Sequence, residues 1–372
     1  LSVSMEGVPL KKKFIKAFEY SDCWIEDSRL VVLNAKDAAK LGAKIYVNTK
    51  VISAKKDDGL WCVETKDQTT GKREVFLSKV LINAGGPWVS DIIHNVLRVN
   101  TPEKVRLVRG SHIVVPKIWD HGKCYFFQGN DGRIIFAIPY ETDFTLIGTT
   151  DIDHTELDEK PQCSELEKNY LINFANQYFD TELKVEDIVW TYSGVRPLQD
   201  TSEGNATAVT RDYSIKVNWE NEVPLINIFG GKITTYRKLS ESVLNEVAAF
   251  FPKMRGPWTA EAYLPGGDFP VNGVSDLILD LLRDYPFLSE KWAARLVKAY
   301  GREAFEMLGN ARNEDDLGIN FGATLTQKEV EWLIGEEFAT SAEDILWRRS
   351  KLGLRMGALQ VKNLQNFIAS QT

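Results

Sequence analysis

A turn between a predicted strand and a predicted helix is the strongest candidate for a ligand site in this sequence. Residues 225–229 (LINIF) are rich in branched and aromatic side chains and predict a buried strand, and the segment after the turn has apolar residues at helical spacing. Gly230 and Gly231 form the turn, so backbone N–H groups and the positive end of the helix dipole would face a flat or anionic ligand. Lys232 and the hydroxyl of Thr234 support this interpretation, although two glycines before a helix can also be only a tight connection.

Two further side chains could carry proton transfer and anion binding. The neutral imidazole of His112 could accept a proton near neutral pH, since the reference pKa of histidine is ~6.5. The planar guanidinium of Arg196, which precedes Pro197 at a predicted strand end, suits a phosphate group. Each residue also has an ordinary explanation: a histidine satisfied inside a sheet, and an arginine in a surface ion pair.

The composition is that of a globular protein and argues against several classes of function. The chain has 372 residues, of which 44% are apolar and 26% charged, with a net charge of -7, and its length predicts two or three domains. The acidic balance argues against a nucleic-acid partner. The four cysteines and four histidines lack metal-ligand spacing, so we predict reduced thiols and no metal site. No apolar run approaches the roughly 18 residues that span a bilayer, and the N-terminus is not a signal peptide.

The N-terminal part of the chain predicts half of a nucleotide-binding α/β domain. A helix is expected at residues 27–42 and a strand at residues 43–47. Three short strands follow, at residues 50–54, 60–65 and 72–77. Residues 79–83 then predict a strand that is buried on both faces and ends at the sharp turn of Gly85.

The remaining sequence changes character twice. Extended segments from Val105 onward predict a large, mostly antiparallel sheet, interrupted by a helix at residues 166–179. After a linker rich in Pro and Gly, the periodicity is helical. The predicted fold class is therefore α/β and α+β. The predicted parts are a linking segment (1–26), a nucleotide-binding half-domain (27–90 with 224–250), a sheet domain (91–223) and a C-terminal helical domain (251–372).

Six motifs in order resemble the aerobic FAD-dependent glycerol-3-phosphate dehydrogenase family. They are EYSDCW (19–24), NAGGPWV (83–89), GSHIVVP (110–116), LIGTTD (146–151), YSGVRPL (192–198) and FGGKITTYRK (229–238). The helical end, with LPGG at 264–267 and LWRR at 346–349, resembles the C-terminal domain of that family. The resemblance implies that the half-domain is the remainder of an FAD-binding domain of the glutathione-reductase-like or D-amino-acid-oxidase-like type, and that the sheet domain binds substrate.

The front of the sequence departs from the family pattern. Family members begin with a strand, a G-x-G-x-x-G turn and a helix that hold the FAD pyrophosphate, and no such fingerprint occurs here. On this interpretation roughly 130 residues, about half a domain, are missing. We therefore expect the chain by itself to bind FAD weakly and to be inactive.

The resemblance also implies roles for individual residues. The turn at Gly230 and Gly231 would lie against the isoalloxazine edge, and His112 would be the base that takes the hydroxyl proton. The predicted catalytic residues are His112, Arg196 and Lys232. The predicted FAD-binding residues are Val51, which would contact the adenine, and Ala84, Gly85, Gly230, Gly231, Lys232 and Thr234.

The implied function is oxidation of sn-glycerol 3-phosphate to dihydroxyacetone phosphate, with FAD as cofactor and membrane quinone as electron acceptor. A close alternative is an oxidase that transfers the electrons to oxygen. An alternative of another class is a cofactor-free binding or assembly module. The implied location is cytoplasmic and peripheral, on the inner face of the cell membrane, and a homodimer is left open.

Overall fold

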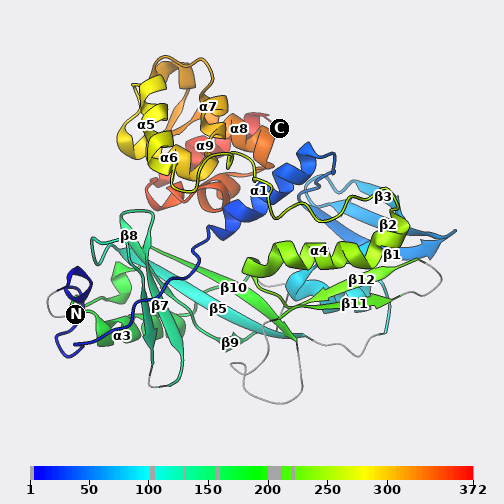
Figure 1. Cartoon of the computed structure of the whole chain (residues 1–372), viewed down its shortest axis with the longest axis horizontal. Coiled ribbons are helices and arrows are strands. Elements are labelled where there is room, and N and C mark those ends of the chain that lie inside the picture. Colours follow the sequence, from blue (N-terminus) through cyan, green and yellow to red (C-terminus); the bar gives the residue numbers. More distant parts are fainter. Residues whose placement is uncertain are drawn as a thin grey trace. The chain divides into compact units, whose positions relative to one another are not determined.

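The computed structural model describes residues 4–100, 105–129, 131–155, 157, 160–199, 212–218 and 223–371. The chain divides into two compact units, whose elements are labelled in Figure 1. The sheet unit comprises Leu1–Ser21 and Asn48–Gly256, and the helical unit comprises Asp22–Val47 and Pro257–Thr372. The predicted combination of mixed α/β structure, a mostly antiparallel sheet and a helical C-terminal part is confirmed.

A six-stranded antiparallel sheet forms the larger part of the sheet unit. Its strand order is β10-β5-β8-β7-β6, and β9 pairs with β5 off this path. The interior strand β5 carries Ile113, Val114 and Val115, which are fully buried, as expected for a strand covered on both faces. The strands are β5 (Val105–Pro116), β6 (Tyr125–Gln128), β7 (Ile134–Tyr140), β8 (Phe144–Gly148), β9 (Ile152–Asp153) and β10 (Trp190–Gln199).

Helix α3 (Glu165–Tyr178) covers one face of this sheet (Figure 1). Leu171 and Phe174 of the helix belong to the same core cluster as Ile113 and Ile147 of the sheet. Because side chains alternate along a strand, the residues that flank Ile113 point to the opposite face, and His112 is one of them. His112 therefore lies on the face of β5 that is turned away from α3. Two short helices complete this region: η1 (Met5–Gly7) and η4 (Val185–Asp187).

A second sheet contains the predicted central strand. β12 (Leu225–Phe229) has the predicted bounds and pairs in parallel with β4 (Leu81–Asn83) and antiparallel with β11 (Ser214–Asn218). Helix α4 (Tyr236–Val247) covers one face (Figure 1), since Val243 and Val247 pack with Ile226. The prediction that β4 is buried on both faces is wrong. Ile82 is 42% exposed, because β4 is the edge strand of this sheet among the described residues.

Five short helical segments adjoin the ends of β4, β12 and α4. They are η2 (Gly86–Trp88), α2 (Val89–Asp91), η3 (Ile92–Val96), η6 (Ile233–Thr235) and η7 (Ala248–Phe250).

The predicted meander forms a separate antiparallel sheet of β1 (Thr49–Asp57), β2 (Leu60–Asp67) and β3 (Arg73–Ser78). Trp61 of β2 is 2% exposed, and its indole N–H donates to the Pro224 carbonyl at 3.0 Å. The strand predicted at residues 43–47 does not form. A strand requires a second strand to pair with, and the described part of the chain provides no pairing strand for this segment.

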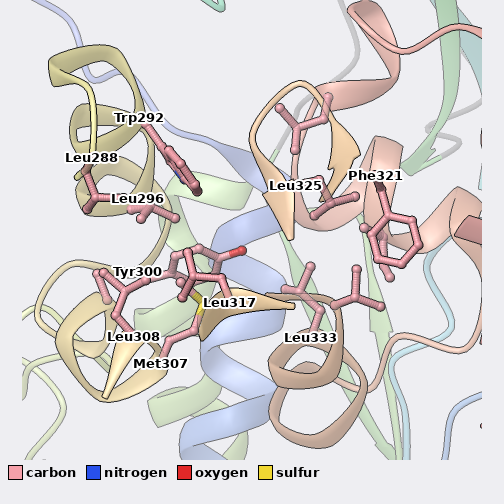
Figure 2. Close-up of a cluster of buried hydrophobic side chains, with 14 of the residues drawn as sticks. Leu288, Trp292, Leu296, Tyr300, Met307, Leu308, Leu317, Phe321, Leu325 and Leu333 are labelled. Atoms are coloured by element: carbon pink, nitrogen blue, oxygen red, sulfur yellow. The ribbon is translucent and has the colours of Figure 1, made fainter. Parts of the chain in front are cut away.

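The helical unit has one large hydrophobic core. Figure 2 shows side chains of this core, including Trp292, Leu296 and Tyr300 of α6, which are at most 6% exposed. The helices are α1 (Asp27–Lys40), α5 (Val274–Asp284), α6 (Glu290–Tyr300), α7 (Glu303–Leu308), α8 (Gln327–Glu337) and α9 (Ala358–Gln371). The shorter elements are η8 (Glu314–Leu317), β13 (Asn320–Gly322), β14 (Leu325–Thr326), η9 (Asp344–Arg349) and η10 (Leu352–Leu354). Within the described ranges, no helix is both long and apolar enough to cross a bilayer.

Helix α1 belongs to the helical unit, although the sequence pattern predicts residues 27–47 as part of the nucleotide-binding half-domain. Buried charges explain this placement. Arg29 forms an ion pair with Glu337 of α8, and Lys36 Nζ lies 3.0 Å from Glu303 Oε2 of α7. Lys36 also lies over the Trp332 ring, 4.2 Å from its centroid. These partners are far apart in sequence, so an amphipathic pattern alone could not identify the surface that α1 covers.

Candidate active site

The predicted base, His112, lies on β5, between two other strands of the large sheet. It pairs with Tyr192 of β10 on one side and with Gly148 of β8 on the other. The His112 and Tyr192 rings are stacked, with centroids 4.7 Å apart and an interplanar angle of 7°. A Cβ at Gly148 would lie only 2.1 Å from His112 Cδ2. Glycine at position 148 therefore leaves the space that the imidazole occupies.

The predicted anion-binding residue, Arg196, is held by the loop that follows β8. Its Nη1 donates to Asp151 Oδ1 at 2.7 Å and to the Thr150 carbonyl at 3.4 Å, and its Nη2 donates to Thr149 Oγ1 at 3.1 Å. A Cβ at Gly110 would lie 2.6 Å from Arg196 Nη2. The guanidinium thus extends over a glycine of β5 and is oriented by three consecutive residues.

The two side chains share one face of the sheet. Tyr192 is paired with His112, and Gly194 is paired with Gly110. Directly paired residues of antiparallel strands point to the same side, and every second residue along a strand does so too. Arg196 is therefore on the face of His112, opposite the face covered by α3. The structure places these two predicted catalytic residues on one face of the sheet.

The predicted cofactor turns lie at the carboxyl ends of two parallel strands. β4 and β12 run in the same direction, and Asn83 Nδ2 donates to Asn227 Oδ1 at 3.0 Å across them. In open α/β sheets, ligands bind at this edge. The turn after β4 contains Ala84 and Gly85, and the turn after β12 contains the Gly230 and Gly231 pair.

These turns fit a flat, anionic cofactor such as FAD. Gly230 and Gly231 have φ angles of +68° and +103°, which only glycine adopts readily. A Cβ at Gly230 would lie 2.8 Å from the Asp212 carbonyl oxygen, and a Cβ at Gly85 would lie 2.5 Å from Ile92 Cδ1. Gly230 therefore requires glycine, because a Cβ there would meet backbone, whereas a Cβ at Gly85 would meet the movable end of the Ile92 side chain. Without a Cβ, the backbone of the Gly230–Gly231 turn can be approached closely by a ring system.

The sheet that carries His112 and Arg196 meets the cofactor turns at one point. A Cβ at Gly230 would lie 3.8 Å from the carbonyl oxygen of Pro197, the residue after Arg196. Strand β10 also contacts η2, which follows Gly85, and β12, which precedes Gly230. His112 and Arg196 are thus in the same region of the sheet unit as the turns at Gly85 and Gly230.

The other predicted site residues have less defined environments. Lys232 precedes η6, and its side chain is exposed, as are Thr234 and Ala84. Val51 lies on β1 of the separate meander and is 37% exposed. Among the described residues, no cluster of three or more His, Cys, Asp or Glu side chains could hold a metal ion.

Sequence reasoning missed the residues that orient His112 and Arg196. Thr149 and Asp151 bind Arg196, and Tyr192 stacks on His112. Gly110 and Gly148 leave the space for both side chains. All five residues lie inside the motifs quoted above. The motifs therefore indicated the right segments, but only the pairing of strands across the sheet shows which residue contacts His112 and which contacts Arg196.

Comparison with known protein families identifies a family for each of two parts of the chain. Residues 4–216 match the model of FAD dependent oxidoreductases. Residues 257–369 match the model described as the C-terminal domain of alpha-glycerophosphate oxidase.

Characterised relatives are similar over most of the chain. It is 44% identical to D-erythritol 1-phosphate dehydrogenase of Brucella abortus, covering 93% of this chain and 69% of that protein. It is 39% identical to aerobic glycerol-3-phosphate dehydrogenase of Escherichia coli, covering 98% of this chain and 72% of that protein. The chain belongs to the FAD-dependent glycerol-3-phosphate dehydrogenase and oxidase family. FAD is therefore its cofactor, as the resemblance implied.

A solved structure supports the fold. The glycerol-3-phosphate dehydrogenase of Bacillus halodurans, complexed with FAD, superposes with a TM-score of 0.75 over 93% of this chain and 72% of that chain, at 24% identity. At this identity the likeness concerns the fold. The roles of individual site residues rest on the geometry described above.

Proposed function

We propose that this protein oxidises sn-glycerol 3-phosphate to dihydroxyacetone phosphate and passes the electrons to a membrane quinone. The observation that carries the proposal is the shared face of His112 and Arg196, next to the glycine turn at Gly230. Oxidation of a secondary alcohol needs a base, a cationic group for the phosphate and a nearby hydride acceptor. This face offers the base and the cationic group, and the neighbouring glycine turn suits the cofactor that accepts the hydride.

Each side chain has a defined task in this proposal. The imidazole of His112 takes the proton of the substrate hydroxyl, while its stacking on Tyr192 limits rotation of the ring. The Arg196 guanidinium binds the phosphate or the oxygen that becomes the carbonyl, and Lys232 adds a second positive charge. Held in place by Thr149 and Asp151, the guanidinium loses little conformational entropy when it binds substrate.

The glycine turns would hold the cofactor. Ala84, Gly85, Gly230 and Gly231 would contact the ring system through their backbone, with Thr234 at the start of the helix and Val51 near the adenine. FAD, when bound, supplies the acceptor for the hydride that leaves the substrate carbon.

Steady-state kinetics of the complete gene product, loaded with FAD, test the proposal. We expect glycerol 3-phosphate to reduce an artificial quinone or dye, with little hydrogen peroxide formed. Peroxide formed in proportion to substrate would identify an oxidase instead. No reduction by glycerol 3-phosphate or any other polyol phosphate would reject the proposal.

A second substrate is favoured by one comparison, the 44% identity to D-erythritol 1-phosphate dehydrogenase. Both candidate substrates are polyol monophosphates, so a phosphate grip by Arg196 and a base at His112 suit either one. Measuring kcat/KM for glycerol 3-phosphate and D-erythritol 1-phosphate under the same conditions separates them. A ratio above about tenfold, equivalent to ~1.4 kcal/mol, would assign the preferred substrate.

Transfer to quinone further requires that the protein reach a membrane surface. We propose peripheral attachment at the cytoplasmic face. Cosedimentation with vesicles of anionic phospholipid, at low and high salt, tests this part separately from the chemistry.

A further inference from the structure

A buried carboxylate, Glu167, lies directly behind the candidate active site. It is in the first turn of α3 and is 3% exposed. Together with Ser164 it forms a capping box, in which the Glu side chain accepts from the N-cap N–H and the Ser hydroxyl accepts from the Glu167 N–H. A capping box needs only one carboxylate oxygen and is usually a surface feature, so the burial of Glu167 calls for another explanation.

The carboxylate joins the helix to two segments of the large sheet. Its Oε1 accepts from Ser111 Oγ and from Thr150 Oγ1, both at 2.7 Å. Its Oε2 accepts from Ser164 N at 2.9 Å, from Ser164 Oγ at 2.8 Å and from Arg109 Nη2 at 2.9 Å. Glu167 thus binds α3, β5 and the loop after β8 at once.

One of those segments carries His112, and the other holds the side chain of Arg196, which extends from β10. Ser111 immediately precedes His112 on β5 and points to the opposite face of the strand. Thr150 lies between Thr149 and Asp151, the two residues whose side chains hold Arg196.

Two further hydrogen bonds close this network. The Ser111 N–H donates to Thr150 Oγ1 at 2.9 Å, so the Thr150 hydroxyl is fixed between the strand and the carboxylate. Ser111 Oγ also lies 2.7 Å from Ser193 Oγ of β10. Strand β5 and the loop therefore bind the carboxylate directly, and β10 is joined to it through the Ser111 hydroxyl.

The carboxylate is charged under all ordinary conditions. Burial alone would raise the pKa of Glu167, but the hydrogen bonds from Ser164, Thr150 and Ser111 outweigh it and lower the pKa to about 2. A buried anion with its lone pairs occupied tolerates little movement of its donors, because each displaced donor would leave charge unsatisfied.

We infer that Glu167 is a positioning residue for the proposed reaction: from the far face of the sheet, it fixes His112 relative to Arg196. The inference rests on the proposed function for its kinetic consequences. Glu167 contacts neither residue directly and acts through Ser111 and Thr150.

The test separates this role from the helix cap. Thr150→Val removes one hydroxyl bridge to Glu167 and leaves the cap intact, whereas Ser164→Ala removes a cap hydroxyl and leaves the bonds to Ser111 and Thr150. In the FAD-loaded complete gene product, we expect Thr150→Val to lower kcat/KM for the preferred polyol phosphate about ten- to a hundredfold, with flavin content unchanged. Ser164→Ala should keep kcat/KM within about twofold, even if both variants lose similar amounts of Tm. Thr150→Ser, which restores the hydroxyl, should recover most of the activity.

A second measurement does not depend on turnover. In protein labelled at histidine, with the His112 imidazole signal assigned by its loss in His112→Asn, Thr150→Val should shift that signal and Ser164→Ala should not. If Thr150→Val does not fold, Glu167→Gln is measured in its place. Wild-type kcat/KM and an unmoved His112 signal in the variant would overturn the inference. A shifted signal in a protein that oxidises no polyol phosphate would support the positioning role and reject the proposed function instead.

Discussion

Gly148 of β8 is paired with His112 of β5, and a Cβ at position 148 would lie 2.1 Å from His112 Cδ2. Gly148→Ala must therefore displace the ring from its stack on Tyr192 or shift the strand. Such overpacking costs about 1 to 3 kcal/mol, and a misplaced base should lower turnover at least about tenfold. Turnover and thermal melts of Gly148→Ala are compared with those of Gly122→Ala, where a Cβ meets no atom within 4 Å. Normal turnover in Gly148→Ala would show that the ring position is unimportant.

Replacing His112 tests the base directly. His112→Asn keeps a polar side chain of similar size but cannot take a proton, so turnover should fall about 10²- to 10⁴-fold while bound flavin is unchanged. The measurement is kcat at several pH values between about 6 and 9, with flavin absorbance as the control. A near-normal rate throughout would leave His112 as an ordinary residue of the sheet.

Arg196→Lys keeps the charge but loses the planar fork that Thr149 and Asp151 orient. Loss of one charge-assisted hydrogen bond to substrate costs roughly 1.5 to 3 kcal/mol, which is about ten- to a hundredfold in kcat/KM. Arg106 is a matched control, since it pairs with Asp153 on the same sheet through an exposed fork. Arg106→Lys should leave kcat/KM unchanged. Equal effects of the two substitutions would remove Arg196 from the site.

Acid should weaken the sheet unit through Glu167. Its pKa is about 2 in the folded protein, below the value of 4.5 for a free side chain, so its stabilising effect is complete above about pH 4.5 and is lost as the pH falls toward 2. The shift corresponds to about 3 kcal/mol. In urea unfolding, the stability difference between wild type and Glu167→Gln should be largest at pH 6 and should shrink at pH 3.5. A difference independent of pH would contradict the assigned shift.

The attachment of α1 can be tested through Arg29. This residue is 7% exposed and pairs with Glu337, which is fully buried, so Arg29→Met leaves a buried carboxylate without its cation. Breaking such a pair costs about 3 to 5 kcal/mol, whereas replacing both partners by apolar residues often restores stability. Urea unfolding of Arg29→Met, of the Arg29→Met and Glu337→Met double variant, and of Arg283→Ala in an exposed pair gives the comparison. The exposed pair should cost less than ~1 kcal/mol.

Local sequence pattern predicted much of the fold. Apolar residues at four of its five positions identified β12 with its bounds, because a buried strand needs apolar side chains on both faces. The helix expected from Asp27 also forms. The pattern failed where a neighbouring strand decides the structure. Residues 43–47 have strand-like composition but no pairing strand in the described ranges. Ile82 is exposed because β4 is an edge strand there.

Some residues of the candidate site could likewise be predicted from the sequence, and others could not. His112, Arg196 and the glycine turns could be selected from residue type and turn position, and their roles stay predictions. Glu167 could not be selected, because its spacing from Ser164 indicates only a helix cap. Its contacts with Ser111 and Thr150 arise from the packing of α3 on the sheet, which no local pattern encodes.

The helical unit is assembled from two pieces of chain, Asp22–Val47 and Pro257–Thr372, with the sheet unit's longest segment encoded between them. During synthesis α1 therefore leaves the ribosome well before Glu303 and Glu337, and Arg29 and Lys36 must stay hydrated until those carboxylates emerge. A gene fragment that starts at Pro257 would lack α1 and would leave both acidic residues without their cations. Soluble expression of this unit would therefore need residues 22–47 to be fused to it or supplied as a separate peptide.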